Sequence, residues 1–177
     1  MTLTDPNFKP SSAAPNALDT DYESTLFVKA PAAEVFDALT TLAGLASWWT
    51  SVSGSGLRGG RLSFMFNDSP LILRVDEAER PATVRWTVLE SAPTPEWVGT
   101  AVTFELMPQA EGCELSFRHR GLTPRLECYN DCKNGWDHFL PSLRQYVETG
   151  KGNPFGSSAD LERREARRLR RQSAAAE

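Results

Sequence analysis

The sequence has no long apolar run, since no stretch of its 177 residues approaches the ~20 consecutive apolar residues of a membrane-spanning helix. Its N-terminus lacks the basic start and the apolar stretch of a secretory signal peptide. Cysteine is scarce, and the odd set of Cys113, Cys128 and Cys132 is not arranged as a disulfide framework. These absences predict a cytoplasmic protein with reduced thiols and no membrane partner.

Groups that would carry familiar chemistry are also few. No Ser-His-Asp or Cys-His arrangement can be assigned from the two histidines. Cys113 and His119 would share a strand face roughly 20 Å apart, too far to hold one ion. Cys128 and Cys132 lie one helical turn apart, but a zinc site needs more than two ligands. The glycine-rich stretch 54–60 lacks the Gly-Lys-Ser/Thr ending of a phosphate loop. The sequence therefore predicts no catalytic residue, no metal site and no cofactor.

Charge is nearly balanced overall but uneven along the chain. The net charge of −4 gives no sign of nucleic-acid binding by the whole molecule. From Gly156 onward, however, six arginines face four acidic residues. We interpret residues 151–177 as a charged, Arg-rich tail, helical over 160–172 and weakly docked because it has few apolar side chains. Interleaved glutamates favour a solvated helix over a surface for nucleic acid or an acidic partner.

The preceding residues divide into a leader and one domain. Residues 1–20, rich in Pro, Ser, Thr and Asn, are predicted to be a flexible leader. Residues 21–150 are expected to form a single domain, in which side-chain alternation predicts six strands. These strands are expected over 22–30, 62–66, 71–75, 84–88, 98–106 and 113–119. Two short helices are predicted between the first two strands, the first opening at Pro31, which suits a first helical position.

The clearest pattern belongs to a helix expected from Arg125 to Glu148. Its large side chains recur every three or four residues, at Tyr129, Cys132, Trp136, Phe139, Leu140, Leu143 and Val147. Such a stripe must be buried, whereas His138 falls on the opposite face and is expected to be solvated. Pro141 cannot donate to the preceding turn, which predicts a bend. The fold class predicted is α+β, with a curved antiparallel sheet wrapped around this long C-terminal helix.

Three stretches resemble the helix-grip superfamily (START, Bet v 1-like or SRPBCC), in particular the group named after the C-terminal domain of the Hsp90 ATPase activator. They are Val28–Thr40, Leu45–Trp49, and Gly135-Trp136 leading to Ser142-Leu143. The resemblance covers roughly residues 22 to 150 and implies a fold that hosts ligand binders, cyclases and partner-binding modules. An Hsp90-type partner is one alternative that it implies. The activator, however, works with an additional N-terminal domain, and a ~20-residue leader is too short to be one.

We expect the concave sheet face and the long helix to enclose an apolar cavity for a small hydrophobic ligand. The candidate lining residues are Trp48, Trp49, Phe64, Phe66, Leu73, Trp86, Val88, Phe104, Phe117, His119, Tyr129, Trp136, Phe139 and Leu140. The alternative is that these rings simply fill the core. His119 could anchor a ligand oxygen or act as an acid or base, although a satisfied structural histidine is favoured. A cyclase or hydrolase would require His119 to face open space.

Overall fold

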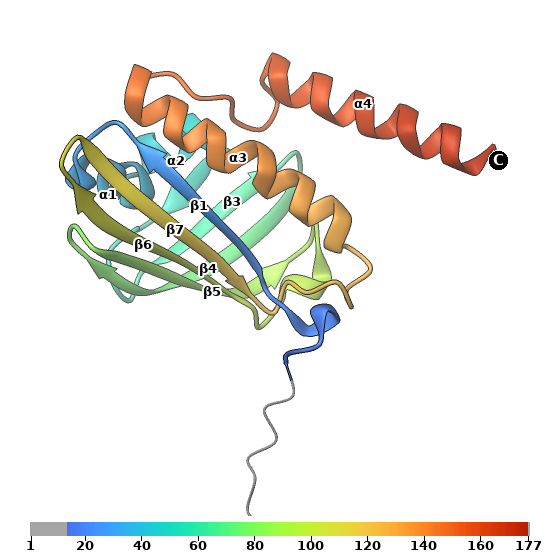
Figure 1. Cartoon of the computed structure of the whole chain (residues 1–177), viewed down its shortest axis with the longest axis horizontal. Coiled ribbons are helices and arrows are strands. Elements are labelled where there is room, and N and C mark those ends of the chain that lie inside the picture. Colours follow the sequence, from blue (N-terminus) through green and yellow to red (C-terminus); the bar gives the residue numbers. More distant parts are fainter. Residues whose placement is uncertain (1–13, 177) are drawn as a thin grey trace, which may run out of the picture.

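A computed structural model describes residues 14–176 and places one curved antiparallel sheet against a long helix (Figure 1). The seven strands follow the order β1-β7-β6-β5-β4-β3-β2. They are β1 (Tyr22–Val28), β2 (Val52–Gly54), β3 (Arg61–Phe66), β4 (Ser69–Glu79), β5 (Thr83–Ser91), β6 (Ala101–Gln109) and β7 (Gly112–Arg120). The helices are α1 (Ala32–Thr40), α2 (Leu42–Trp48), α3 (Tyr129–Thr149) and α4 (Ser158–Ala175), with short 3-10 turns η1 (Ala17–Asp19) and η2 (Pro95–Trp97).

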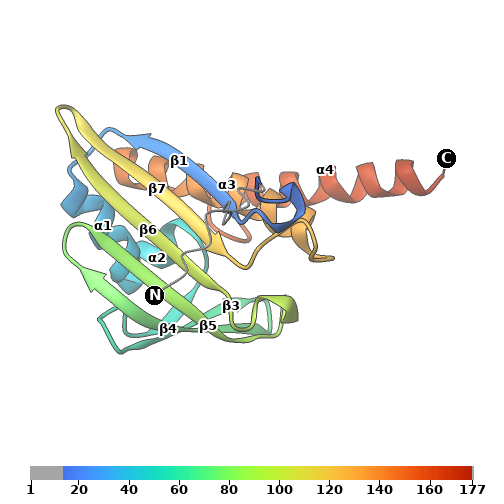
Figure 2. The ribbon, with the colours of Figure 1, turned by 60° about the horizontal axis from the view of Figure 1, so that its bottom comes forward.

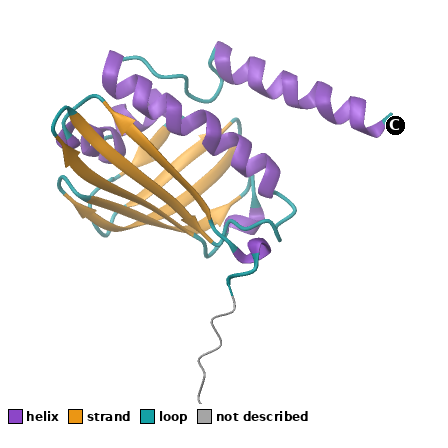
Figure 3. Ribbon diagram, viewed as in Figure 1, coloured by secondary structure: helices purple, strands orange, loops and turns teal. Residues whose placement is uncertain are grey.

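This architecture confirms the predicted α+β helix-grip fold, and Figure 3 shows the sheet and helices as separate layers. Alternation of side chains sets the two faces of each strand. In β7, Cys113, Leu115, Phe117 and His119 point inward and are buried, while the residues between them are not. The first and last strands of the chain are neighbours in the sheet: β1 and β7 pair antiparallel, with Tyr22 opposite His119.

The sequence prediction missed one strand and misplaced the start of another. The three-residue strand β2 pairs with β3 at the sheet edge, and it is too short to show alternation. Strand β6 begins at Ala101 instead of Val98, because η2 and a turn at Gly99, with φ of 84°, occupy the preceding residues. Residues 1–13 of the predicted leader lie outside the described range, while Ala17–Asp19 of that leader form η1.

The long helix α3 begins at Tyr129, four residues later than predicted. The carboxylate of Glu96 accepts hydrogen bonds from the amides of Glu127 and Cys128, at 3.1 and 2.9 Å, and so satisfies donors just before the helix. The helix continues through Pro141 and ends at Thr149, and the next residue, Gly150, has the left-handed conformation common after a helix. The bend expected at Pro141 stays a prediction.

The tail forms α4, which runs back along the first half of α3 and projects beyond the start of α3 (Figures 1 and 2). Its first turns contact the domain, whereas residues from Arg168 onward are exposed. Among residues 14–176, no helix combines the length and apolar character needed to span a bilayer.

Candidate ligand-binding site

The space between the sheet and α3 is largely filled by aromatic rings. Trp49 stacks on Trp48 with centroids 5.6 Å apart and on Trp86 at 6.0 Å, and Trp86 meets Phe104 edge to face at 5.1 Å. Several candidate residues are at most 2% exposed, namely Trp48, Phe64, Leu73, Trp86, Val88, Phe104, Phe117 and Leu140. The side chains of these residues pack against one another and fill the core, which was the alternative to a ligand cavity. Over residues 14–176 they leave no open space between the middle of the sheet and α3.

A pocket of about 280 Å³ remains at the edge of this core, between β3, η2, α3 and the start of α4. Six rings line it, those of Trp49, Phe66, Trp97, Trp136, Phe139 and Phe155. Trp97 and Trp136 stack with centroids 5.8 Å apart and planes 5° from parallel, and Phe66 meets Phe155 edge to face at 5.1 Å. The pocket is therefore a shallow, aromatic-walled recess in place of the enclosed cavity expected from the sequence.

The space in the pocket depends on Gly135 of α3, which also lines it. A Cβ atom added to Gly135 would meet no atom within 4 Å, so this position faces open space. Its neighbour Trp136 supplies an aromatic wall and is itself only 2% exposed. A residue with no side chain thus keeps one side of the recess empty.

Four candidate residues, Trp49, Phe66, Trp136 and Phe139, line this pocket. Tyr129 is half-buried at the start of α3 and does not line it. The sequence analysis missed Trp97 and Phe155, because both lie in irregular segments where periodicity carries no signal. The sequence offered only a weaker signal, a single aromatic residue that follows a proline within two positions: Trp97 after Pro95 and Phe155 after Pro154.

Arginine side chains attach the tail to α3, since Arg163 donates to Asn134 at 2.7 Å and Arg167 and Arg171 pair with Asp131. A buried carboxylate, that of Asp160, organises the first turns of α4 itself. Asp160 is fully buried, accepts from the Gly156 amide at 2.9 Å, and lies 2.6 Å from Arg163 Nη2 and 3.0 Å from Arg164 Nε. Burial acts to raise the pKa of Asp160, but the Gly156 amide and the two arginines outweigh it and hold the pKa below its ordinary value. All these partners of Asp160 lie in the tail, so the cluster stabilises the start of α4 and does not itself join α4 to the sheet or to α3.

His119 is sealed in the core and does not line the pocket. Trp136 Nε1 donates to His119 Nδ1 at 3.1 Å, so Nε2 carries the proton of the neutral ring and donates to Thr100 Oγ1 at 2.8 Å. The Thr100 hydroxyl in turn donates to the Trp97 carbonyl at 2.6 Å. Burial lowers the pKa of His119 to about 3. The ring is a satisfied structural element and reaches no open space.

His138 also differs from expectation. It is half-buried, and its Nε2 lies 2.9 Å from the Asn153 carbonyl, so it ties α3 to the segment that leads into α4. It was expected to be solvated because the polar face of α3 was assumed to face water, but the returning tail covers part of that face.

Stability should depend on pH through His119. The unfolded chain takes up a proton on this residue below its ordinary pKa of about 6.5, whereas the folded chain resists protonation until about 3. Because the pKa of His119 is lower in the folded state, its neutral form favours folding. Its contribution to the free energy of unfolding is therefore fully present above pH 6.5 and is lost as the pH falls below that value. Between pH 7 and pH 5 we expect His119 to account for a loss of about 2 kcal/mol in the free energy of unfolding.

Urea denaturation of the wild type and of His119→Gln at several pH values measures this loss. The variant should be less stable at pH 7, because the buried Trp136 and Thr100 groups lose a matched partner, but its stability should vary less with pH. The contribution of His138 is common to both proteins and cancels in the difference. If the stability of the two proteins varied with pH in the same way, the loss of stability could not be attributed to His119.

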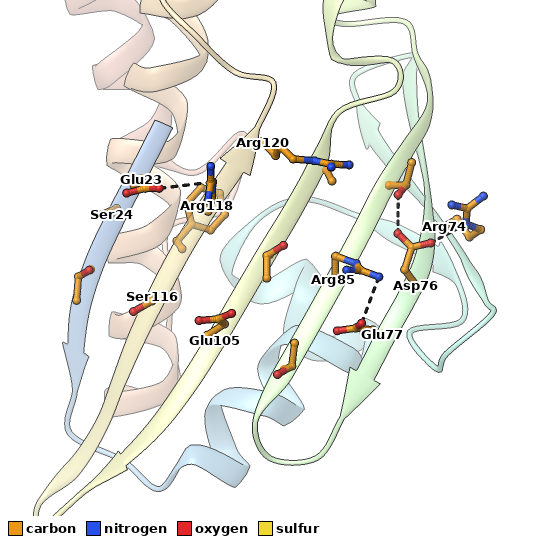
Figure 4. A pocket seen from close by; sticks show the side chains of 16 residues that line it. Glu23, Ser24, Arg74, Asp76, Glu77, Arg85, Glu105, Ser116, Arg118 and Arg120 are labelled. Atoms are coloured by element: carbon orange, nitrogen blue, oxygen red, sulfur yellow. Dashed lines mark hydrogen bonds and ion pairs between the residues drawn. The ribbon is translucent and has the colours of Figure 1, made fainter. Parts of the chain in front are cut away.

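A second hollow lies on the outer face of the sheet, opposite α3, and Figure 4 shows its side chains. It has a volume of about 760 Å³, and acidic and basic side chains alternate across it. Asp76 is largely covered, and its carboxylate pairs with Arg74 at 2.7 Å and accepts a hydrogen bond from Thr87. Arg85 pairs with Glu77 at 3.2 Å. Because its charges largely satisfy one another and its walls are hydroxyls and ions, this hollow is poorly suited to an apolar ligand.

Within the described part of the chain, no group of three or more His, Cys, Asp or Glu side chains is placed to hold a metal ion. Cys132 is buried and lies 3.1 Å from the Trp97 indole nitrogen. Burial raises the pKa of both Cys132 and Cys128, so both thiols stay protonated at neutral pH.

A curved antiparallel sheet packed against the long helix α3, with a recess at the edge of the core between them, defines a helix-grip protein. The family model described as activator of Hsp90 ATPase homolog 1-like protein matches residues 29–148, and the chain belongs to this family. The match ends before Phe155 and α4, so part of the pocket wall comes from outside the family region.

Solved structures with the same fold support this family assignment. The chain is 30% identical to the Aha1 dimer of Colwellia psychrerythraea, with a TM-score of 0.68 over 75% of this chain and 99% of that one. It is 22% identical to protein MLL2253 of Mesorhizobium loti, with a TM-score of 0.65 over 72% and 96% of the two chains, a likeness of fold alone. It is 27% identical to DynU16, a protein of the dynemicin biosynthetic locus, with a TM-score of 0.61 over 75% and 48% of the two chains. No curated protein matches the chain.

Proposed function

We propose that the chain binds a small aromatic molecule in the recess between α3, α4 and the sheet. The observation that carries this proposal is an open space of about 280 Å³ walled by six rings and kept clear by Gly135. Ligand sites are typically concave, largely apolar and of a few hundred Å³, so the recess lies near the small end of that range. A flat ring inserted there would add to the stack of Trp97 and Trp136, and each such aromatic pair contributes ~1 kcal/mol beyond burial.

The chemistry expected of the bound state is recognition without catalysis. Besides ring faces, Cys132 and the arginines of α4, the pocket is lined by Ser91, Thr94 and Asp131. Ser91 accepts from the Thr94 amide at 3.2 Å and Asp131 pairs with Arg167 and Arg171, so no nucleophile among the lining residues is paired with a base. His119 faces away from the pocket into sealed core, which leaves the cyclase or hydrolase alternative without its acid or base.

Titration with phenylnaphthylamine, a neutral fluorescent probe in which a phenyl ring is joined to a naphthalene, tests the proposal. We expect saturable binding of one probe per chain, with a dissociation constant on the order of micromolar because the recess is small and half open. Tryptophan emission should be quenched in parallel, since three indoles line the site. A folded protein that gives no saturable signal would contradict the proposal.

A second candidate is a protein-binding role, favoured by the family description and by the charged hollow on the outer sheet face. The two candidates use opposite faces of the sheet, because the residues of β5 that line the hollow, Thr83, Arg85 and Thr87, alternate with the buried Val84, Trp86 and Val88. An Hsp90-type partner would contact the outer face and leave the recess accessible. Occupation of one face therefore need not exclude occupation of the other.

A further inference from the structure

The helix α4 brings positive charge to the mouth of the recess. Arg163, Arg164 and Arg167 line it together with Asp131 of α3. Asp160 pairs with Arg163 and Arg164, and Asp131 pairs with Arg167 and Arg171. Four arginines thus meet two aspartates, and the mouth keeps two positive charges in excess. An excess of charge beside aromatic walls indicates the polarity of the ligand that fits there.

The arginines differ in how far they are already engaged. Arg163 donates from Nη1 to Asn134 at 2.7 Å and from Nη2 to Asp160 at 2.6 Å, and its side chain is only 15% exposed. Arg167 donates to Asp131, which it shares with Arg171. Arg163 and Arg167 therefore already donate to protein acceptors, and their main role is to hold α4 against α3.

Arg164 is different. Its Nε lies 3.0 Å from Asp160 Oδ2, yet this contact lacks hydrogen-bond geometry, and Nε is buried without an acceptor. The Nη nitrogens of Arg164 have no hydrogen-bond partner among the described residues, and the side chain is 37% exposed. Its guanidinium lies 4.5 Å from the centre of the Phe155 ring, which is itself a wall of the recess. Cation–π contact thus holds the group at the mouth while its outer donors stay open.

We propose that the ligand is an aromatic molecule with one oxyanion, a carboxylate or a group of similar charge, received by Arg164. This inference rests on the proposed function and names the ligand class for the same recess. A guanidinium offers two parallel donors that match the two oxygens of such a group. The ring would enter among Trp97, Trp136 and Phe155, and the oxyanion would face α4. A cationic ligand would meet the excess positive charge and be repelled.

The recess favours a small molecule over an extended nucleic acid. Arg164 and Arg167 line the recess of about 280 Å³ and also, with Arg168 and Arg171, a hollow along α4, but Asp131 pairs with two of these four arginines. Glu165 pairs with Arg168 at 2.6 Å on the exposed side of α4, which removes part of the charge that a phosphate backbone would need.

Two probes with the same ring system test the inference, the neutral phenylnaphthylamine and the anionic anilinonaphthalene sulfonate. In Arg164→Gln we expect the sulfonate probe to bind about tenfold more weakly, with the neutral probe unchanged. Arg168→Gln is the matched control, since it removes the same charge from the same helix but does not line the recess. It should leave both affinities unchanged. Arg164→Lys keeps the positive charge but loses the two parallel donors of the guanidinium, so its affinity for the sulfonate probe should lie between those of the wild type and Arg164→Gln.

The outcomes separate the two proposals. Equal weakening of the sulfonate probe by Arg164→Gln and Arg168→Gln would mean that general charge attracts it, and would overturn the role of Arg164 while leaving the recess as a ligand site. Binding of the neutral probe with no effect of either variant on the sulfonate would overturn the inference in the same way. Binding of neither probe to the folded wild type would remove the proposed function, and this inference with it. Thermal unfolding of each variant shows that its fold is retained, and Arg164→Lys decides the matter where Arg164→Gln is unstable.

Discussion

Gly135→Phe should fold normally and yet lose binding of phenylnaphthylamine by about a hundredfold or more, which corresponds to ~3 kcal/mol. Gly135 faces the recess, and an added Cβ atom meets nothing within 4 Å, so a larger side chain has room to enter the space that the probe would occupy. Glycine inside a helix costs about 1 kcal/mol relative to alanine, so its replacement in α3 carries no backbone penalty. The stability of the variant, measured by thermal unfolding, should equal or exceed that of the wild type.

Gly135→Ala is the matched control for this prediction. Its single methyl group should raise the free energy of unfolding by about 1 kcal/mol while occupying little of the recess. Probe affinity should fall only slightly in this variant. If Gly135→Phe bound the probe as well as the wild type does, the probe would have to occupy another part of the molecule, and the recess would not be the ligand site.

The fold could be predicted from the sequence because burial leaves a periodic trace. The inward residues of β7 alternate along the strand, and the stripe of α3 recurs every three or four residues, so each pattern reports directly on one buried face. Strand β2 left no such trace, since three residues are too few for alternation. Irregular segments likewise concealed Trp97 and Phe155.

The pocket was harder to predict, because periodicity says which rings face inward but not whether they fill the space. Phe64, Trp86 and Phe104 have the same pattern as Phe66, yet the first three are sealed and Phe66 borders the recess. The difference arises from the sum of side-chain volumes and from the absence of a side chain at Gly135. The arginine wall was missed for another reason: apolar content was taken as the measure of docking, whereas Arg163 and Arg167 reach α3 through polar contacts with Asn134 and Asp131.

The sealed core itself should be costly to disturb. Trp86→Ala is expected to lower the free energy of unfolding by about 3–5 kcal/mol, because a fully buried ring is replaced by a cavity that its neighbours cannot fill. Trp86 contacts Trp49, Phe64 and Phe104, with centroids 5.1 to 6.0 Å away, so the loss would reach across the core. Urea denaturation monitored by circular dichroism measures the change, and a loss below about 1 kcal/mol would contradict tight packing around this ring.

Comparison with Trp48 separates ring packing from hydrogen bonding in this core. Trp48 Nε1 donates to the Ala38 carbonyl, near the end of α1, at 2.9 Å, whereas Trp86 Nε1 is buried without an acceptor among the described residues. Trp48→Phe and Trp86→Phe remove the same volume from fully buried positions, but only the first removes a hydrogen bond. We therefore expect Trp48→Phe to cost about 1–2 kcal/mol more than Trp86→Phe. Equal losses would mean that the bond to Ala38 adds nothing, and that ring packing alone holds α1 and α2 against the sheet.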